Sequence, residues 1–143
     1  MRYSLLIAIV LLAIGCTPPS MNMQRSGLRG ICDAGTTAAL DAVSEESLPA
    51  VQKDIKDTCD ALSKFMADGK VADLVYSDFR AAIEKLIPQN LKSYFDAVLA
   101  AASTQELDIG KLGTNNVKRI NAAILGVQLA NAQYAKEDRP VKK

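Results

Sequence analysis

The sequence SLPAVQKDIKDTCDALSKFMADG at residues 47–69 contains the clearest helical pattern in the chain. Apolar residues recur at three- and four-residue steps, and charged residues fall between them. Ser47 can cap the start, Pro49 suits the first turn and Gly69 can end the helix. The apolar side consists of Leu48, Val51, Ile55, Cys59, Leu62 and Met66. This stretch therefore predicts an amphipathic helix over residues 48–67 with one face against a core.

Four further segments repeat apolar residues with the same helical period. They cover about residues 28–43, 71–87, 89–103 and 114–135. Gly30 and Gly35 each cost about 1 kcal/mol of helix propensity, so the first segment is expected to become regular only near Thr36. Pro88 disfavours helical backbone in the residue before it and predicts a break between the third and fourth of the five segments. Because no segment shows a sustained period of two, the sequence predicts an all-α bundle of four to five amphipathic helices in one domain, residues 28–137.

The composition of the 143-residue chain narrows the range of functions. Its 17 basic and 16 acidic residues nearly cancel and are interspersed, which argues against a nucleic-acid partner, because such proteins normally present a basic face. Histidine is absent, so the commonest general base and the commonest metal ligand are both missing. No nucleophile is paired with a recognisable base. The sequence therefore predicts a protein that is not an enzyme and holds no cofactor or metal.

Two polar clusters are open to more than one interpretation. Asp54, Asp57 and Asp60 lie three residues apart and can share a cation, but lysines alternate with them, which favours a solvated face of ion pairs. The last helix is rich in side-chain amides, which can line a groove, join two helices or form a polar face. These amides belong to Asn115, Asn116, Asn121, Gln128 and Asn131.

The chain begins with one basic residue, Arg2, followed by an unbroken apolar run over residues 5–14. Ten residues of helix rise only about 15 Å, half the thickness of a hydrocarbon core, and Pro18 and Pro19 stop a longer helix. A basic segment, a short apolar segment and a small residue at the cleavage site are the layout of a secretory signal peptide. Residues 1–15 are therefore expected to be a signal peptide rather than a spanning helix.

The end of this segment, Ala13-Ile14-Gly15-Cys16, resembles the lipobox of bacterial lipoproteins, with alanine where leucine is most usual. The resemblance implies cleavage before Cys16, a diacylglycerol on the Cys16 sulfur and often a further acyl chain, such as palmitate, on the new amino group. Two or three acyl chains hold a protein stably on a bilayer. The resemblance thus implies a lipid-anchored protein of the cell envelope. Thr17 is similar to the outer-membrane default of Gram-negative lipoproteins, which face the periplasm.

Two segments flank the expected domain. Residues 16–27 have no helical or strand period and contain Pro, Ser, Asn and Gly, so they are expected to form a flexible tether that follows the lipidated cysteine. Residues 138–143 contain Arg139, Lys142 and Lys143 and are expected to be a solvated basic tail. An alternative for this tail is a weak contact with anionic head groups or peptidoglycan.

With Cys16 assigned to the lipid, Cys32 and Cys59 remain. An even pair of cysteines in an oxidising compartment predicts a disulfide, here between the inward faces of two consecutive helices. Two free buried thiols are the alternative. A redox pair would need a closer Cys-x-x-Cys spacing, and a metal site would need more ligands.

These observations lead to two hypotheses for the function. The first is a non-catalytic, membrane-anchored envelope lipoprotein whose domain binds an unidentified envelope protein, either as an accessory subunit or as a factor that occludes a receptor or toxin. The second is a carrier of a small apolar ligand, which needs a cavity of some hundreds of Å³ lined by the third to fifth helices. The residues that suggest it are the expected core-facing alanines Ala38, Ala39, Ala82, Ala101, Ala122 and Ala123.

Overall fold

The computed structural model describes residues 20–103 and 110–134. The predicted signal peptide at residues 1–15, the lipidation site Cys16 and the basic tail at residues 138–143 lie outside these ranges. The helices are α2 (Met21–Asp41), α3 (Leu48–Met66), α4 (Tyr76–Glu84), α5 (Lys92–Ala102) and α6 (Gly113–Gln133), with short 3₁₀ helices η1 (Val71–Asp73) and η2 (Gln89–Leu91). The described ranges contain no strand beyond one isolated bridge between Val75 and Lys111, so the all-α prediction is confirmed.

Helix α2 begins at Met21, seven residues before the predicted start. Ser20 is its N-cap, and the Ser20 hydroxyl accepts a hydrogen bond from the Met23 amide at 3.3 Å. Gly30 and Gly35 lie within one continuous helix, so the expectation that its regular part begins near Thr36 is wrong. Packing along α6 outweighs the propensity cost of these glycines. The predicted tether at residues 16–27 is corrected as well, because its second half is helical.

Helix α3 agrees with its prediction to within one residue. Leu48, Ile55, Cys59, Leu62 and Met66 on the predicted apolar side are all buried. One detail differs at its start, where Ser47 makes no capping hydrogen bond with its side chain. A turn closed by Ser44 takes that place instead.

The predicted third helix, residues 71–87, is divided into η1 and α4. Leu74 and Val75 between them are extended, and the Leu74 carbonyl accepts a hydrogen bond from the Leu112 amide at 2.8 Å. This pairing with a distant segment competes with helical hydrogen bonds, which local periodicity does not reveal. The predicted break at Pro88 is confirmed, and the segment after it forms η2 and α5.

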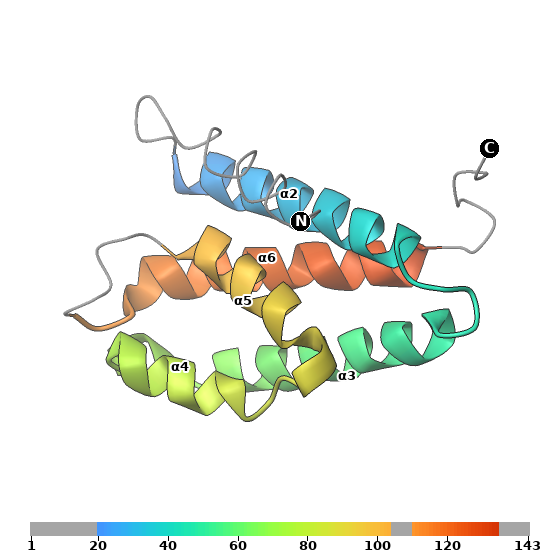
Figure 1. The fold of residues 1–143 in the computed structure, drawn as a ribbon. Helices are drawn as coiled ribbons and strands as arrows, with labels where there is room; N and C mark the ends of the chain where they lie inside the picture. The colour runs from blue at the N-terminus through green and yellow to red at the C-terminus, as the bar shows by residue number, and fades with distance from the viewer. Residues whose placement is uncertain (1–19, 104–109, 135–143) are drawn as a thin grey trace.

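Helix α6 is the central element of the bundle, with α2 on one side, α3 on the other and α5 across it (Figure 1). Helices α2 and α6 run in the same direction, since Gln24 contacts Arg119 near their starts and Asp41 contacts Tyr134 near their ends. Helix α3 runs the opposite way. The core between the helices is filled by large, fully buried side chains, which include Leu40, Leu62, Phe79, Ile83, Phe95, Leu99, Ile120 and Ile124.

Candidate functional site

The two described cysteines are free thiols and both are buried, so the predicted Cys32–Cys59 disulfide is not formed. The prediction assumed that α2 and α3 face each other directly. Instead both helices pack against α6, and Tyr94 of α5 lies close to both thiols. The Tyr94 hydroxyl is hydrogen-bonded to that of Thr36. Because the Thr36 hydroxyl donates its one proton to the Cys32 carbonyl at 2.6 Å, Tyr94 is the donor to Thr36. A tyrosine near both thiols is thus held in place by its own hydrogen bond.

Burial controls the chemistry of these thiols. It raises the pKa of Cys32 to about 11 and, together with the nearby Asp60 charge, that of Cys59 to about 12. The Tyr94 pKa is raised too, chiefly by burial. A thiolate is the reactive form of cysteine, so both thiols are unreactive near neutral pH. They are core residues rather than a redox site.

We expect Cys32 and Cys59 to react with a thiol reagent only slowly in the native protein and rapidly in denaturant. A raised folded-state pKa means that the unfolded chain releases the thiol protons first, so stability should be intact below pH 9 and fall as the pH rises through 11 and 12. Urea titrations at a series of alkaline pH values measure this loss. Replacing Cys59 with alanine should make the loss smaller, and an unchanged pH dependence in that variant would contradict the assignment.

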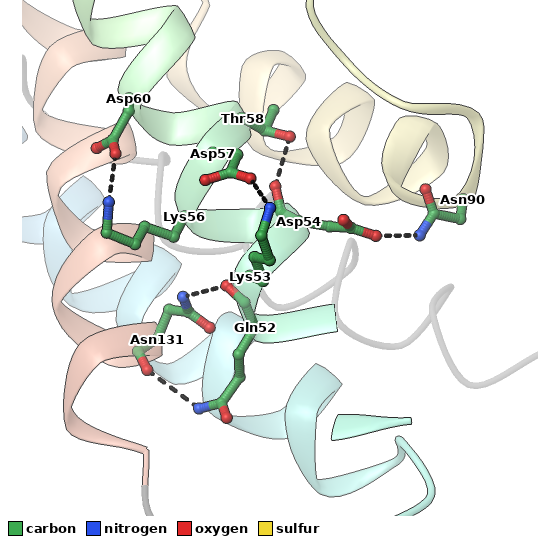
Figure 2. A network of polar contacts seen from close by, with 9 residues as sticks. All are labelled: Gln52, Lys53, Asp54, Lys56, Asp57, Thr58, Asp60, Asn90 and Asn131. Carbon is green, nitrogen blue, oxygen red and sulfur yellow. Dashed lines mark hydrogen bonds and ion pairs between the residues drawn. The ribbon is translucent and has the colours of Figure 1, made fainter. Parts of the chain in front are cut away.

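The carboxylates of α3 are each engaged by a separate partner, as Figure 2 shows. Lys53 pairs with Asp57 and Lys56 with Asp60, both at 2.6 Å, while Asp54 accepts a hydrogen bond from Asn90 at 3.1 Å. The hydrogen bond to Asp57 raises the pKa of Lys53. Within the described ranges no cluster of metal-ligating residues is found. The predicted face of solvated ion pairs is therefore confirmed, and the three carboxylates do not converge on a common point.

The amides of α6 take several of the roles that the sequence left open. Asn131 donates to the Gln52 carbonyl at 2.9 Å, and Gln52 donates back to the Asn131 and Tyr134 carbonyls at 3.3 and 3.2 Å (Figure 2). Carbonyls in the last turn of a helix lack intrahelical partners, so the Gln52 side chain supplies hydrogen-bond donors to two carbonyls at the end of α6. Gln128 contacts Ser63 of α3 at 3.4 Å, whereas Asn121 lines a groove between α6 and α2.

We expect Asn131→Ala to lower the free energy of unfolding by about 1–3 kcal/mol, because it removes one half of the reciprocal contact between α3 and α6. Asn121→Ala, the same change at an exposed position of the same helix, should stay within about 0.5 kcal/mol of the parent. Chemical denaturation of the two variants measures the difference. Equal effects would show that the contact does not hold the helices together.

A groove of about 360 Å³ lies between the first half of α2 and the middle of α6. Its lining residues are Asn22, Arg25, Ser26, Arg29, Asn121, Ala122 and Leu125. On α2 these residues follow the three- and four-residue spacing of one helix face, and on α6 the same spacing places exposed Lys118 one turn before Ala122. Five of the seven lining residues are polar or charged, and no residue of α3, α4 or α5 contributes to the lining. It differs in place and chemistry from the cavity that an apolar-ligand carrier would need.

Three exposed basic residues lie on or beside this groove, and we call them the basic surface: Arg25, Arg29 and Lys118. None of the three side chains has a hydrogen bond or ion pair in the part of the chain that the structure describes, and none of the groove's lining residues is acidic. Beside it, half-buried Arg119 donates to the Ala102 carbonyl at 2.9 Å and to Gln24, and burial lowers its pKa. Its guanidinium joins α6 to both α5 and α2.

Charge is unevenly distributed over the pair of α2 and α6. Helix α6 contains no acidic residue, and the first acidic residue of α2 is Asp33. The other end of the pair is acidic, with Asp41 at the end of α2 and Glu45 and Glu46 just after it. Sequence reasoning missed the basic surface, because Arg25 was expected in a flexible tether. The signal that could have found it is the helical spacing of residues 22, 25, 26 and 29.

None of the described helices combines the length and the hydrophobicity that crossing a bilayer requires. Comparisons with known proteins give no match, whether to a family model, to a curated protein or to a solved structure.

Proposed function

We propose that this protein is a lipid-anchored module of the cell envelope, which is attached to a membrane through Cys16 and binds another envelope protein without catalysing a reaction. The observation that carries the proposal is Ala13-Ile14-Gly15-Cys16 at the end of a short apolar run. The anchor gives the domain a location, and the helical bundle gives it a rigid surface to present. If the cell is Gram-negative, Thr17 favours the outer membrane and a domain that faces the periplasm.

The carboxylates of α3 and the two described thiols, the groups most often used in catalysis, have structural roles in this fold. Their roles support binding rather than catalysis. Asp57 and Asp60 are ion-paired with neighbouring lysines, and Asp54 is hydrogen-bonded to Asn90. Both described thiols are buried in the core with raised pKa values. About half of the exposed described residues are charged or amide side chains, which suit recognition of a partner. The groove between α2 and α6 has no lining residue from α3, α4 or α5, so it is not the cavity that the alternative of an apolar-ligand carrier requires.

We expect the parent protein to remain with membranes after an alkaline wash and Cys16→Ala to be released, because ten apolar residues are too short to span a bilayer. Cys32→Ala and Cys59→Ala are the matched controls and should remain bound. Cell fractionation followed by immunoblotting measures the distribution. Crosslinking in intact cells should then capture the same envelope protein with the parent and both controls, and much less of it with Cys16→Ala. A Cys16→Ala protein that stays with washed membranes would contradict the anchor.

A further inference from the structure

The connection between the proposed anchor and the folded domain is short. Only residues 17–20 separate Cys16 from Met21, the first residue of α2. Five residue-to-residue steps span at most about 18 Å in a fully extended chain. A lipid on Cys16 would therefore keep the start of α2 close to the head groups. Because α6 runs parallel to α2, the start of α6 would be kept there too.

This end of the molecule carries the basic surface. Arg25 and Arg29 extend from the first turns of α2, and Lys118 extends from the second turn of α6. The nearest carboxylate along α2 is that of Asp33, one turn beyond Arg29, and it forms no ion pair with Arg29. The parallel helices also place two positive dipole ends on the same side. The basic surface itself thus contains charges of one sign that form no ion pair with the described residues, whereas Asp73 near the start of α6 is paired with Lys111.

Apolar side chains accompany these cations. Among the described residues three large hydrophobic side chains are exposed, and two of them are here: Met23 in the first turn of α2, at 66 %, and Leu125 in the groove, at 42 %. Basic residues beside exposed apolar side chains are typical of surfaces that lie at a membrane interface. Attraction between charges acts over a Debye length of about 8 Å at physiological salt, and a tether of at most about 18 Å lets the surface come within that range.

We propose that the basic surface of Arg25, Arg29 and Lys118 lies against anionic lipid head groups of the membrane that holds Cys16. This inference rests on the proposed lipid anchor and adds an orientation to it: α2 and α6 start at the membrane, and the acidic end with Glu45 and Glu46 points away from it. The acidic end is then the part of the pair presented to a partner. The same cations could hold a free phosphate compound or a nucleic acid, but neither would make use of the short connection.

The test uses the full chain, purified from membranes and reconstituted into vesicles of phosphatidylcholine alone or with a third of phosphatidylglycerol. Acetylation of each lysine is followed by peptide mass spectrometry. Lys118 should be acetylated about fivefold more slowly on the phosphatidylglycerol vesicles, and high salt should abolish the difference. Exposed Lys64 and Lys85, on other elements of the bundle, are internal controls and should react at the same rate on both vesicles.

Two double variants test whether the protection of Lys118 depends on the basic surface or on positive charge elsewhere in the protein. Arg25→Ala with Arg29→Ala should abolish the protection of Lys118. Lys53→Ala with Lys56→Ala, which also replaces two exposed basic residues of one helix, should leave it unchanged. All four positions are solvent-exposed, so both proteins should fold, as circular dichroism can verify.

The outcomes distinguish the anchor from the orientation. Equal acetylation of Lys118 on both vesicles, with the chain still floating on neutral vesicles, would overturn the orientation and leave the anchor standing. A chain that fails to float on neutral vesicles would overturn the anchor and this inference with it. Equal protection of Lys118 by glycerol phosphate or by a short DNA duplex, added to neutral vesicles at matched phosphate concentration, would overturn the assignment to a lipid surface.

Discussion

Replacing Phe79 with alanine should lower the free energy of unfolding by about 4 kcal/mol, the largest effect expected for one substitution in this bundle. Phe79 of α4 is completely buried. Its ring lies 6.3 Å from that of Phe65 on α3 and 6.2 Å from that of Tyr76, measured between centroids. Removing the ring loses the free energy gained by transferring its surface out of water. It also leaves a cavity that the surrounding helices close only in part.

Two control variants make this prediction sharper. Phe79→Leu retains most of the volume and should cost less than about 1.5 kcal/mol. Met23→Ala removes a large side chain that is 66 % exposed and should stay within about 0.5 kcal/mol of the parent. Urea unfolding followed by circular dichroism measures all three. A Phe79→Ala protein as stable as Met23→Ala would mean that α4 does not pack against α3 in the way described.

Replacing Gly126 with alanine should destabilise the protein by about 2 kcal/mol, although alanine favours a helix by about 1 kcal/mol over glycine. Gly126 is in the middle of α6, where that helix meets α2. A methyl group built there would lie 3.1 Å from the Arg29 Cα and carbonyl carbon and closer still to the Arg29 carbonyl oxygen. These are backbone atoms, so no side-chain rotation relieves the clash and the two helices must separate.

Gly30 provides the matched control for Gly126. It lies inside α2, and a methyl group there would meet no atom within 4 Å. Gly30→Ala should therefore stabilise the protein by about 0.5–1 kcal/mol, opposite in sign to Gly126→Ala. Thermal and chemical denaturation of the two variants measure the signs directly. Stabilisation by both substitutions would show that α2 and α6 do not approach each other closely at Gly126.

The sequence was most informative where one face of a helix meets the core. The apolar stripe of α3 predicted its bounds to within one residue, and Pro88 predicted the break before α5. Both signals are local, because a periodic face and a proline act through neighbouring residues. The all-α class followed from the same periodicity.

Features that depend on distant partners could not be predicted in this way. Residues 21–27 contain polar residues typical of a linker, yet they form the first turns of α2. We attribute this to the packing of α2 along α6, which lies far away in the sequence. The extended residues Leu74 and Val75 depend on a partner segment near Leu112. The cysteine pairing was wrong because adjacency in sequence was taken for adjacency in space, and Tyr94 lies close to both thiols.

The basic surface could not be predicted from the sequence for a related reason. Counted along the chain, 17 basic and 16 acidic residues nearly cancel and predict no charged face. The parallel pairing of α2 with α6 places Lys118 beside the half of α2 that carries Arg25 and Arg29, whereas acidic residues lie at or just after the other end of α2. Net charge describes the sum of these groups, whereas a surface depends on where the fold places them.

The mass of the N-terminal peptide of the protein extracted from membranes is the most direct test of the lipid anchor. We expect a peptide that begins at Cys16 and carries a diacylglycerol on the sulfur, with or without a further acyl chain on the amino group. Cys32 and Cys59 in the same sample should be unmodified. A peptide that begins at Met1 or Thr17, or one that begins at Cys16 without lipid, would contradict the proposed anchor.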